Sequence, residues 1–191
     1  MPMITTRPQV SMMPKMQMNV ASPSPTQANA TATETPKPVS RKSIWGPAIW
    51  FFFHASAEKL KPEFFSTTGK ELLNHIITVC NNLPCPECTG HASAYMKQIN
   101  VNNIRTKDDL VQMLFVFHNQ VNKRLGHPEF AYSDLKPKYQ SANLINVYNN
   151  FIVYFNDKHY SIRMIAEEMF RARLCKQMTA WMQSNINAFD V

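Results

Sequence analysis

Apolar side chains recur every three or four residues along most of this chain, and this spacing limits what it can fold into. In residues 70–82, Leu72, Leu73, Ile76 and Ile77 fall on one face of a helix. The helices predicted in this way span about 43–60, 70–82, 85–99, 106–125, 141–155 and 160–185. The sequence therefore predicts an all-α fold, with a small bundle of four or five helices followed by a helical C-terminal extension.

The predicted fourth helix has a recognisable start and end. Thr106 and Asp109 form a capping box in which Asp replaces the usual Glu. Gly126 and Pro128 predict its end, because glycine readily adopts the left-handed C-cap conformation and proline cannot continue a helix.

The first 40 residues differ from the rest in composition. They contain seven of the 13 prolines and six of the 12 methionines, and Glu34 is their only acidic residue. Such a segment cannot pack into a core and is predicted to be a disordered tail. Its low acidity suggests a transit peptide, but frequent prolines prevent the amphipathic helix that transit peptides form.

Composition excludes several classes of protein. The four glycines, at positions 46, 69, 90 and 126, are too far apart to form either GxGxxG or GxxxxGK. No stretch approaches the roughly 18 apolar residues of a membrane span. The net charge of +7 comes from scattered basic residues, so dedicated nucleic-acid binding is not expected. Four cysteines are too few for a secreted disulfide scaffold, and an intracellular, reducing setting is expected.

Two cysteines lie at the predicted start of a helix. The motif from Cys85 to Cys88 follows the helix-breaking Pro84, and a helical run begins directly after it. A helix N-terminus favours the thiolate and can lower a cysteine pKa from about 8.5 to roughly 3.5–7.5. Two cysteines one turn apart can also close a disulfide with little backbone movement. These features favour a redox centre over two inert thiols.

Zinc is the other chemistry open to this motif. A zinc site would need two further ligands, and the sequence has no second CxxC and no HxxxH, although His54, His91 and His118 are available in principle. We therefore expect no metal. A thioredoxin-like site is also excluded, because both neighbours of the motif are predicted helices rather than parts of a βαβ unit. A redox centre in an all-helical bundle needs another electron acceptor.

Two predicted helices combine aromatic and polar side chains on one face. Trp50 and His54 share a face of the first helix, and Phe115, His118 and Asn122 share a face of the fourth. Aromatic residues at helical spacing usually belong to a core. A core avoids His and Asn, however, whereas a flat heteroaromatic ligand requires such groups at its edges.

Three motifs occur in order along the chain: Trp45-Gly46-Pro47 with Trp50-x-x-x-His54, Leu83-Pro84-Cys85-x-x-Cys88, and His118-Asn119-x-Val121-Asn122-x-x-Leu125-Gly126. Together they resemble the Erv/ALR family of FAD-linked sulfhydryl oxidases, over about residues 42–139. The resemblance implies a four-helix bundle with a short fifth helix, FAD held between the helices and usually a homodimer. It also implies the oxidation of two protein thiols by dioxygen to a disulfide and hydrogen peroxide.

The resemblance also implies roles for individual residues. Cys85 would exchange with the substrate thiol, and Cys88 would lie against the isoalloxazine and pass electrons to it. The positions implied to surround FAD are Gly46, Trp50, His54, His118, Asn119, Asn122, His127, Lys138 and Tyr139. Trp and His rings suit stacking on flat rings, and Asn amides suit their polar edges. His127 stands where the family often has Lys.

The chain departs from the family pattern in its cysteines. Many members have a structural disulfide where this chain has Phe115 and Tyr132, with sixteen residues between them. We expect an aromatic contact, or the C-terminal extension, to supply part of the missing constraint. No separate shuttle pair is evident, because Cys80 and Cys175 are single and are expected to be buried. This reduced set resembles the enzymes of large cytoplasmic DNA viruses, which use a small relay thiol protein.

The sequence thus predicts an FAD-dependent thiol oxidase that forms disulfides in protein substrates and reduces O2 to H2O2. The alternative is a non-catalytic helical module that uses CxxC as a zinc or structural site. The expected regions are a tail at 1–40, an FAD-binding domain at 41–140 and a helical extension at 141–191. Expected partners are a thiol-containing protein or relay protein and a second copy of the chain. The expected location is the cytoplasm, or a virion if the protein is viral, rather than the mitochondrion.

Overall fold

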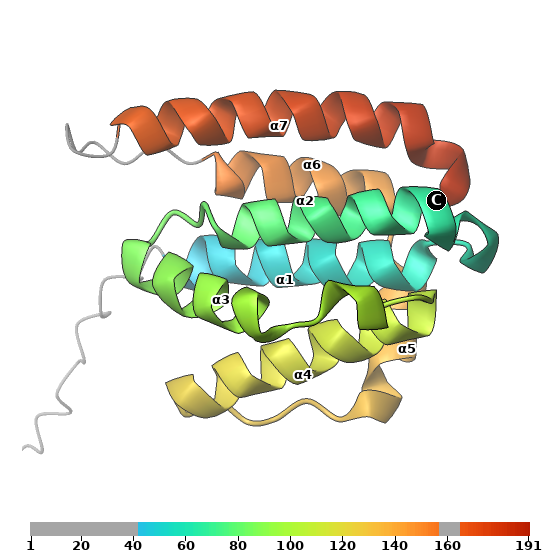
Figure 1. The fold of residues 1–191 in the computed structure, drawn as a ribbon, viewed down its shortest axis with the longest axis horizontal. Coiled ribbons are helices and arrows are strands. Elements are labelled where there is room, and N and C mark those ends of the chain that lie inside the picture. The colour runs from blue at the N-terminus through green and yellow to red at the C-terminus, as the bar shows by residue number, and fades with distance from the viewer. Residues whose placement is uncertain (1–41, 157–164) are drawn as a thin grey trace, which may run out of the picture. The chain divides into compact units, whose positions relative to one another are not determined.

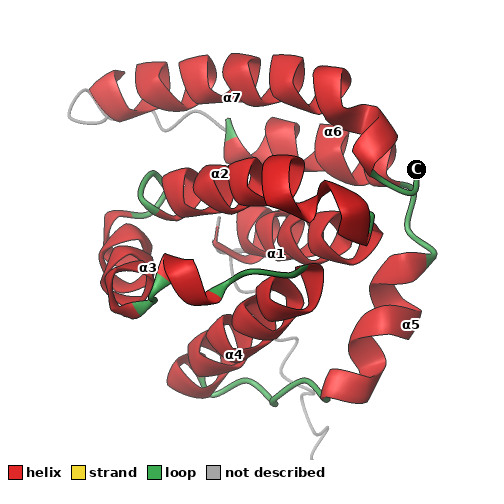
Figure 2. Ribbon diagram, turned by 45° about the vertical axis from the view of Figure 1, so that its right-hand side comes forward, coloured by secondary structure: helices red, strands yellow, loops and turns green. Residues whose placement is uncertain are grey.

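The computed structural model describes residues 42–156 and 165–191. Within these ranges every regular element is helical apart from an isolated bridge between Leu60 and Phe189, which confirms the all-α prediction (Figure 2). The tail predicted at 1–40 lies outside the described residues, as does the start of the last predicted helix, 160–164.

Seven α-helices lie in the described part of the chain: α1 (Lys42–Lys59), α2 (Lys70–Cys80), α3 (Pro86–Gln98), α4 (Lys107–Leu125), α5 (Leu135–Gln140), α6 (Leu144–Phe155) and α7 (Ile165–Asn185). Five shorter helical turns connect or end them: η1 (Pro62–Phe64), η2 (Phe65–Gly69), η3 (Val101–Asn103), η4 (Tyr132–Asp134) and η6 (Ile186–Ala188). The short fifth helix implied by the family resemblance is α5. None of the described helices is long and apolar enough to cross a membrane.

The ends of α4 confirm the local predictions. The Thr106 hydroxyl accepts a hydrogen bond from the Asp109 backbone N–H at 3.1 Å, and the Asp109 carboxylate accepts one from the Thr106 N–H at 2.9 Å. At the other end, Gly126 has φ = 71°, which is the left-handed conformation expected of a glycine C-cap. These local interactions fix the length of the helix that carries the His118 motif.

Helix α1 is packed against several partners. It contacts α4, α5 and α6, and it lies between α6 and α4 in both views (Figures 1 and 2). On the α6 side, the fully buried ring of Phe52 stacks on Phe151 at 4.4 Å and meets Tyr148 edge-on at 5.5 Å. Because α1 is apolar around most of its circumference, it can be covered on more than one side.

The C-terminal helix α7 is joined to α2 and to the segment before it. The Trp181 indole N–H donates to the Glu71 carboxylate at 2.7 Å, and the Thr68 hydroxyl donates to the Asn185 side-chain oxygen at 3.2 Å. Beyond α7, the Asp190 N–H donates to the carbonyl of Lys59 at 2.8 Å. The chain end is therefore fastened to the end of α1.

The aromatic contact predicted at the position of the missing disulfide is present. The rings of Phe115 on α4 and Tyr132 on η4 meet edge-on, with centroids 5.2 Å apart and planes at 89°. This geometry is favourable for an aromatic pair. It ties the loop that follows α4 back onto that helix without a covalent bond.

Candidate active site

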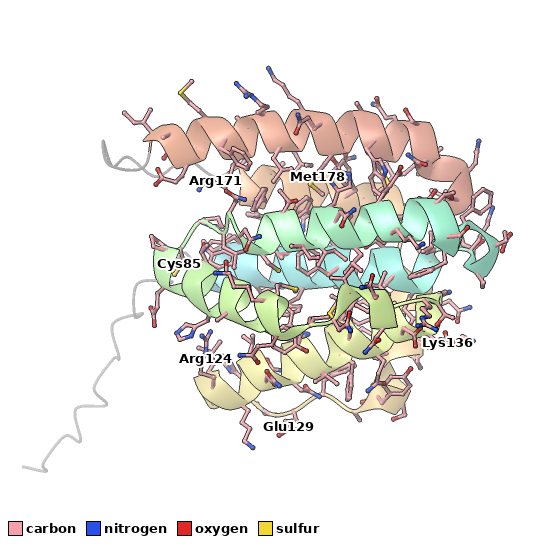
Figure 3. The ribbon with its side chains drawn as sticks, in the orientation of Figure 1. Cys85, Arg124, Glu129, Lys136, Arg171 and Met178 are labelled. Atoms are coloured by element: carbon pink, nitrogen blue, oxygen red, sulfur yellow. The ribbon has the colours of Figure 1, made fainter. Side chains whose placement is uncertain are left out.

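The two sulfurs of the CxxC motif meet at the first turn of α3. Cys85 is the N-cap, and its sulfur accepts a hydrogen bond from the backbone N–H of Cys88 at 3.3 Å. The two Sγ atoms lie 2.6 Å apart, near one end of the bundle (Figure 3). An N-cap sulfur beside unsatisfied helical amides is stabilised as a thiolate, so the position is suited to thiol–disulfide exchange.

The turn before the motif is held by a threonine. The Thr89 hydroxyl lies 3.2 Å from the carbonyl oxygen of Leu83 and 3.1 Å from that of Cys85, and it can donate to either. Pro84 is buried, and Pro86 occupies the first helical position, where a missing N–H costs nothing. The sequence therefore fixes the direction in which the two sulfurs leave the backbone.

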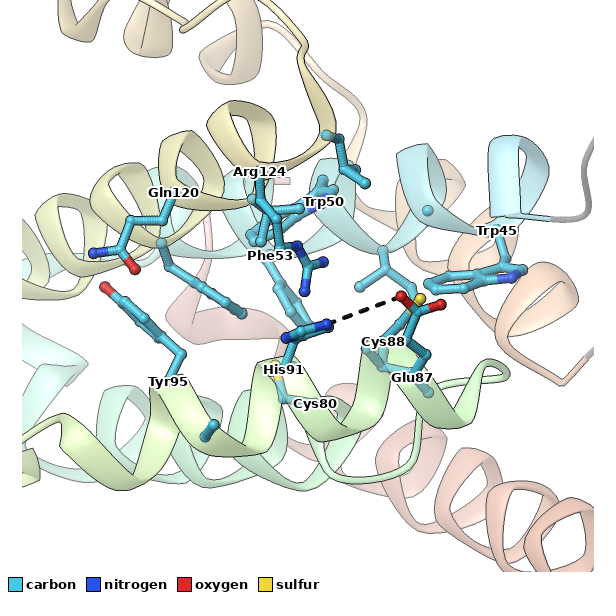
Figure 4. Close-up of a pocket in the computed structure, with 18 of the residues that line it drawn as sticks. Trp45, Trp50, Phe53, Cys80, Glu87, Cys88, His91, Tyr95, Gln120 and Arg124 are labelled. Atoms are coloured by element: carbon cyan, nitrogen blue, oxygen red, sulfur yellow. Dashed lines mark ion pairs between the residues drawn. The ribbon is translucent and has the colours of Figure 1, made fainter.

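A cavity of about 460 Å³ opens between α1, α3 and α4 (Figure 4). Cys88 lines it, and Cys85 is not among its lining residues. Its aromatic walls come from Trp45, Trp50, Phe53, Tyr95 and Phe117. Rings from different helices contact one another there: Tyr95 stacks on Phe117 at 4.3 Å, and Trp50 meets Phe117 edge-on at 5.0 Å. The cavity therefore offers flat apolar surfaces beside a single reactive sulfur.

Polar side chains also line this cavity. His91 on α3 and Arg124 on α4 lie on facing sides of it (Figure 4). The His91 Nε2 atom is 4.0 Å from the Glu87 carboxylate, one helical turn earlier. Gln98 and Gln120 add amide groups. A flat ligand with hydrogen-bonding edges and a negatively charged part would find complementary groups here.

Next to the cavity, four rings from three helices stack in series. Trp50 of α1 stacks on His118 of α4, with centroids 4.0 Å apart and planes at 5°. His54 of α1 in turn stacks on Tyr139 of α5 at 4.9 Å and 13°. The two histidines are joined by a hydrogen bond of 3.0 Å between Nε2 of His54 and Nδ1 of His118. We call these four residues the ring stack.

The electrostatics of the ring stack keep its histidines neutral. Burial, with smaller contributions from His118 and Lys138, lowers the pKa of His54 from 6.5 to about 3. Burial and Lys138 lower the pKa of His118 from 6.5 to about 4. Burial also raises the pKa of Tyr139 to about 12, so its hydroxyl stays protonated. At neutral pH one imidazole nitrogen of the pair donates and the other accepts.

The structure places Cys85 at the N-cap of α3, outside the cavity lining, and separates the other predicted site residues into three groups. Gly46, Trp50 and Cys88 line the cavity. His54, His118 and Tyr139 belong to the ring stack, which reaches the cavity through Trp50. The remaining predicted residues lie on the side of the loop after α4, and none of them lines the cavity: Asn119, Asn122, His127 and Lys138.

The loop-side residues make defined contacts of their own. Asn119 exchanges two hydrogen bonds of 2.9 Å with the backbone of Phe130. The Asn122 amide donates to Asn119 at 3.5 Å. The Lys138 ammonium lies 4.7 Å from the centroid of the Phe130 ring. His127 is exposed.

Several cavity residues were missed at the sequence level: Glu87, His91, Tyr95, Gln98 and Arg124. The sequence offered a signal for two of them. His91 and Tyr95 follow Cys88 by three and seven residues, which places all three on one face of α3. The other three are polar residues on amphipathic helices, for which exposure to solvent is the usual expectation.

The remaining cysteines are buried, as predicted. Cys80 is 1% exposed, lies at the wall of the cavity, and has its pKa raised by burial. Cys175 lies on α7, and burial raises its pKa to about 11. Neither thiol is therefore ionised at neutral pH. In the part of the chain that the structure describes, no group of three or more His, Cys, Asp or Glu side chains is placed to hold a metal ion.

Sequence comparisons identify known relatives of this chain. Residues 47–140 match the Erv1/Alr family. A FAD-linked sulfhydryl oxidase of African swine fever virus is 32% identical over 105 residues, covering 52% of this chain and 83% of the viral protein. A putative FAD-linked sulfhydryl oxidase of Invertebrate iridescent virus 6 is 32% identical over 103 residues, covering 51% of this chain and 93% of that protein.

A more distant relative is a probable FAD-linked sulfhydryl oxidase of Vaccinia virus, strain Copenhagen, which is 28% identical over 96 residues and covers 49% of this chain and 93% of that protein. No solved structure matches the chain. The family match includes the CxxC motif, the ring stack and the cavity helices from Pro47 onward, whereas Trp45 and Gly46 precede it and α6 and α7 lie beyond it. On this match and these relatives, the chain belongs to the Erv1/Alr family of sulfhydryl oxidases.

Proposed function

We propose that this protein is an FAD-dependent thiol oxidase that forms disulfides in protein substrates and reduces O2 to H2O2. One observation carries the proposal: Cys88, hydrogen-bonded to Cys85 at a helix N-terminus, also lines an aromatic cavity. The names of the relatives specify FAD. The residues present fit that group, because the cavity combines flat walls for a tricyclic ring with polar side chains for its edges.

The first step is exchange at Cys85. A client thiolate attacks the Cys85 sulfur of the Cys85–Cys88 disulfide, a mixed disulfide forms, and Cys88 leaves as a thiolate. A second client thiol then attacks the client sulfur of the mixed disulfide, so that the client disulfide forms and Cys85 leaves. The Cys88 N–H that points at the Cys85 sulfur stabilises this leaving thiolate. The enzyme now holds the client's two electrons as a dithiol.

The second step starts from Cys88, the cysteine that lines the cavity. FAD, when bound, would supply a two-electron acceptor for the dithiol and a donor to O2, which takes up two electrons and two protons to become H2O2. Cys88 would hold its sulfur at the cavity wall where the ring binds, and loss of two electrons and two protons from the dithiol restores the Cys85–Cys88 disulfide. The aromatic walls keep water from this contact.

We assign FAD binding to the predicted residues in two ways. Gly46 and Trp50 line the cavity and would contact the isoalloxazine, while His54, His118 and Tyr139, which stack beside the cavity and reach it through Trp50, would support that contact. The polar residues of the loop side complete the proposed site: Asn119, Asn122, His127 and Lys138. Arg124, which faces His91 across the cavity, adds a positive charge suited to a diphosphate.

The proposal extends to partners and to the division of the chain. The substrate is a protein thiol, carried by a client or by a small relay thiol protein, and a second copy of the chain is a further partner. We propose the cytoplasm as the place of action. Residues 41–140 form the FAD-binding sulfhydryl oxidase domain, and residues 141–191 form an extension without a catalytic residue.

Visible absorption and oxygen uptake test the proposal together. The purified protein is expected to be yellow, and Cys88→Ser should retain the flavin spectrum but lose oxygen consumption with a dithiol substrate. Cys175→Ser is the matched control, since this thiol is buried on α7 and should leave turnover unchanged. Oxygen uptake by Cys88→Ser at the wild-type rate would contradict the assigned roles. A colourless protein that takes up no FAD from excess, or that contains stoichiometric zinc, would contradict the function.

A further inference from the structure

The side-chain amide of Asn119 hydrogen-bonds to the loop after α4. Its Nδ2 donates to the carbonyl oxygen of Phe130 at 2.9 Å, and its Oδ1 accepts from the Phe130 N–H at 2.9 Å. The same Oδ1 also accepts the longer hydrogen bond, of 3.5 Å, from Asn122. An amide that pairs with both backbone groups of one residue fixes the position and orientation of that residue. Asn119 thus clamps Phe130 to α4.

A positively charged side chain lies over the ring of Phe130. The Lys138 ammonium lies 4.7 Å from the Phe130 centroid and 5.4 Å from the centroid of Tyr139. A cation is attracted to an aromatic face within about 6 Å, so the two rings together define where this ammonium sits. Tyr139 is itself fixed in the ring stack against His54.

We infer that Asn119 is a positioning residue, which clamps Phe130 and thereby holds the Lys138 ammonium beside the hydrogen-bonded pair of His54 and His118. The inference rests on the proposed function, since it gives the pair a role at the cofactor, and it deepens that function by naming a positive group that adds to the effect of burial on the pair. It refines the place of Asn119 in the proposed FAD site, from a direct contact with the cofactor to an action through Phe130 and Lys138.

The charged and titratable groups around the pair determine whether the two pKa values are raised or lowered. His54 and His118 face each other from α1 and α4, Tyr139 faces His54 from α5, and Lys138 is the charged group whose field acts on both imidazoles. A nearby positive charge disfavours a second one. Lys138 therefore preserves a neutral donor–acceptor pair, and displacement of Lys138 makes protonation of the pair easier.

The test measures the titration of the two imidazoles in the full-length protein as purified. Long-range ¹H–¹⁵N spectra report each ring, with His54→Gln used for assignment. Lys138→Gln should raise the pKa of His118 and His54, because it removes the charge, while burial keeps both values below 6.5. Asn119→Ala should raise them in the same direction although it removes no charge. The double variant should match Lys138→Gln alone, because both changes act through one ammonium.

Two further variants serve as controls for Lys138→Gln and Asn119→Ala. Lys136→Gln removes a neighbouring lysine of α5 that does not act on the pair, and it should leave both titrations in place. Phe130→Leu keeps the clamp and removes the aromatic face, so it should reproduce part of the Asn119→Ala shift, and it decides the matter if Asn119→Ala does not fold.

Two results would overturn the inference. One is an unchanged pair of titrations in Asn119→Ala, and the other is a double variant whose shift is the sum of the two single shifts. Failure of the proposed function is seen separately, as a wild-type protein that binds no FAD, because the titrations need no turnover. If Asn119→Ala lowers FAD affinity and leaves the titrations alone, Asn119 is a direct ligand and the inference is wrong.

Discussion

Helix α1 buries different kinds of side chain on its two sides, one facing the rest of the family-matched bundle, residues 47–140, and the other facing α6. On the bundle side, α1 contributes Trp50 to a cavity and His54 to a buried hydrogen bond with another helix. On the side of α6, it contributes Phe52 to a stack of rings that continues through Phe151 to Phe155. The bundle side retains space and buried polar groups, which lower stability, whereas the α6 side of α1 is filled by stacked aromatic rings. The comparison indicates that chemistry and stabilisation are divided between two faces of one helix.

The largest expected effect comes from emptying the apolar side. Phe151→Ala removes a fully buried ring and should lower the free energy of unfolding by about 3–5 kcal/mol, measured by urea denaturation. The flavin spectrum and turnover per folded molecule should stay the same, because Phe151 does not line the cavity. Val153→Ala, on the same helix but 66% exposed, should change stability by less than about 0.5 kcal/mol. If Phe151→Ala lost its flavin without a change in the free energy of unfolding, the division between the two sides of α1 would be wrong.

Acidification should weaken the bundle side. His54 has a pKa of 6.5 when unfolded and about 3 when folded, so the unfolded chain binds more protons below pH 6.5. The free energy of unfolding should therefore fall by on the order of 3 kcal/mol between pH 6.5 and 4 from this residue alone. Burial raises the pKa of Glu58, which opposes the trend. Denaturation across this pH range should show a shallower slope in His54→Gln, and equal slopes would contradict the assignment.

A smaller effect is expected where an aromatic pair stands in place of a disulfide. Phe115 and Tyr132 should show a coupling of about 1 kcal/mol in a double-mutant cycle with Phe115→Leu and Tyr132→Leu. Because the contact is not covalent, a reductant should leave the size of this coupling unchanged. A coupling near zero would mean that the loop is held by Asn119 alone.

The smallest expected effect tests the fastening of α7. Trp181→Phe removes the hydrogen bond to Glu71 and keeps the ring, so unfolding should become easier by about 0.5 kcal/mol, since the interaction is exposed. Glu71→Gln keeps an acceptor and should cost less. Neither change should alter flavin binding, and an altered spectrum would show that α7 influences the cavity.

Sequence reasoning succeeded where structure is local or repeated in a family. The ends of α4 depend on Thr106, Asp109 and Gly126, which act within one turn, and they were predicted correctly. The Phe115–Tyr132 contact followed from the spacing of a known cross-link. The CxxC motif was placed at a helix N-terminus because Pro84 had to end the preceding helix.

The rest depends on contacts between distant segments. The ring stack joins residues 50, 54, 118 and 139 from three helices, and no short pattern reports how such rings face one another. The pairing of Asn119 with Phe130 was missed because an asparagine beside a predicted cofactor site is expected to serve the cofactor. The position of α7 could not be predicted for a similar reason, since it is set by single contacts such as that of Trp181 with Glu71.

The placement of α1 between two sets of partners has a consequence for how the protein can change. One residue inserted before Phe52 would rotate the rest of this helix by about 100°, since an α-helix has 3.6 residues per turn. Phe52 would lose its stacking contact with Phe151, and His54 would at the same time lose its hydrogen bond to His118. Insertions and deletions within α1 are thus penalised twice, and length variation in this protein belongs in its loops and at its ends.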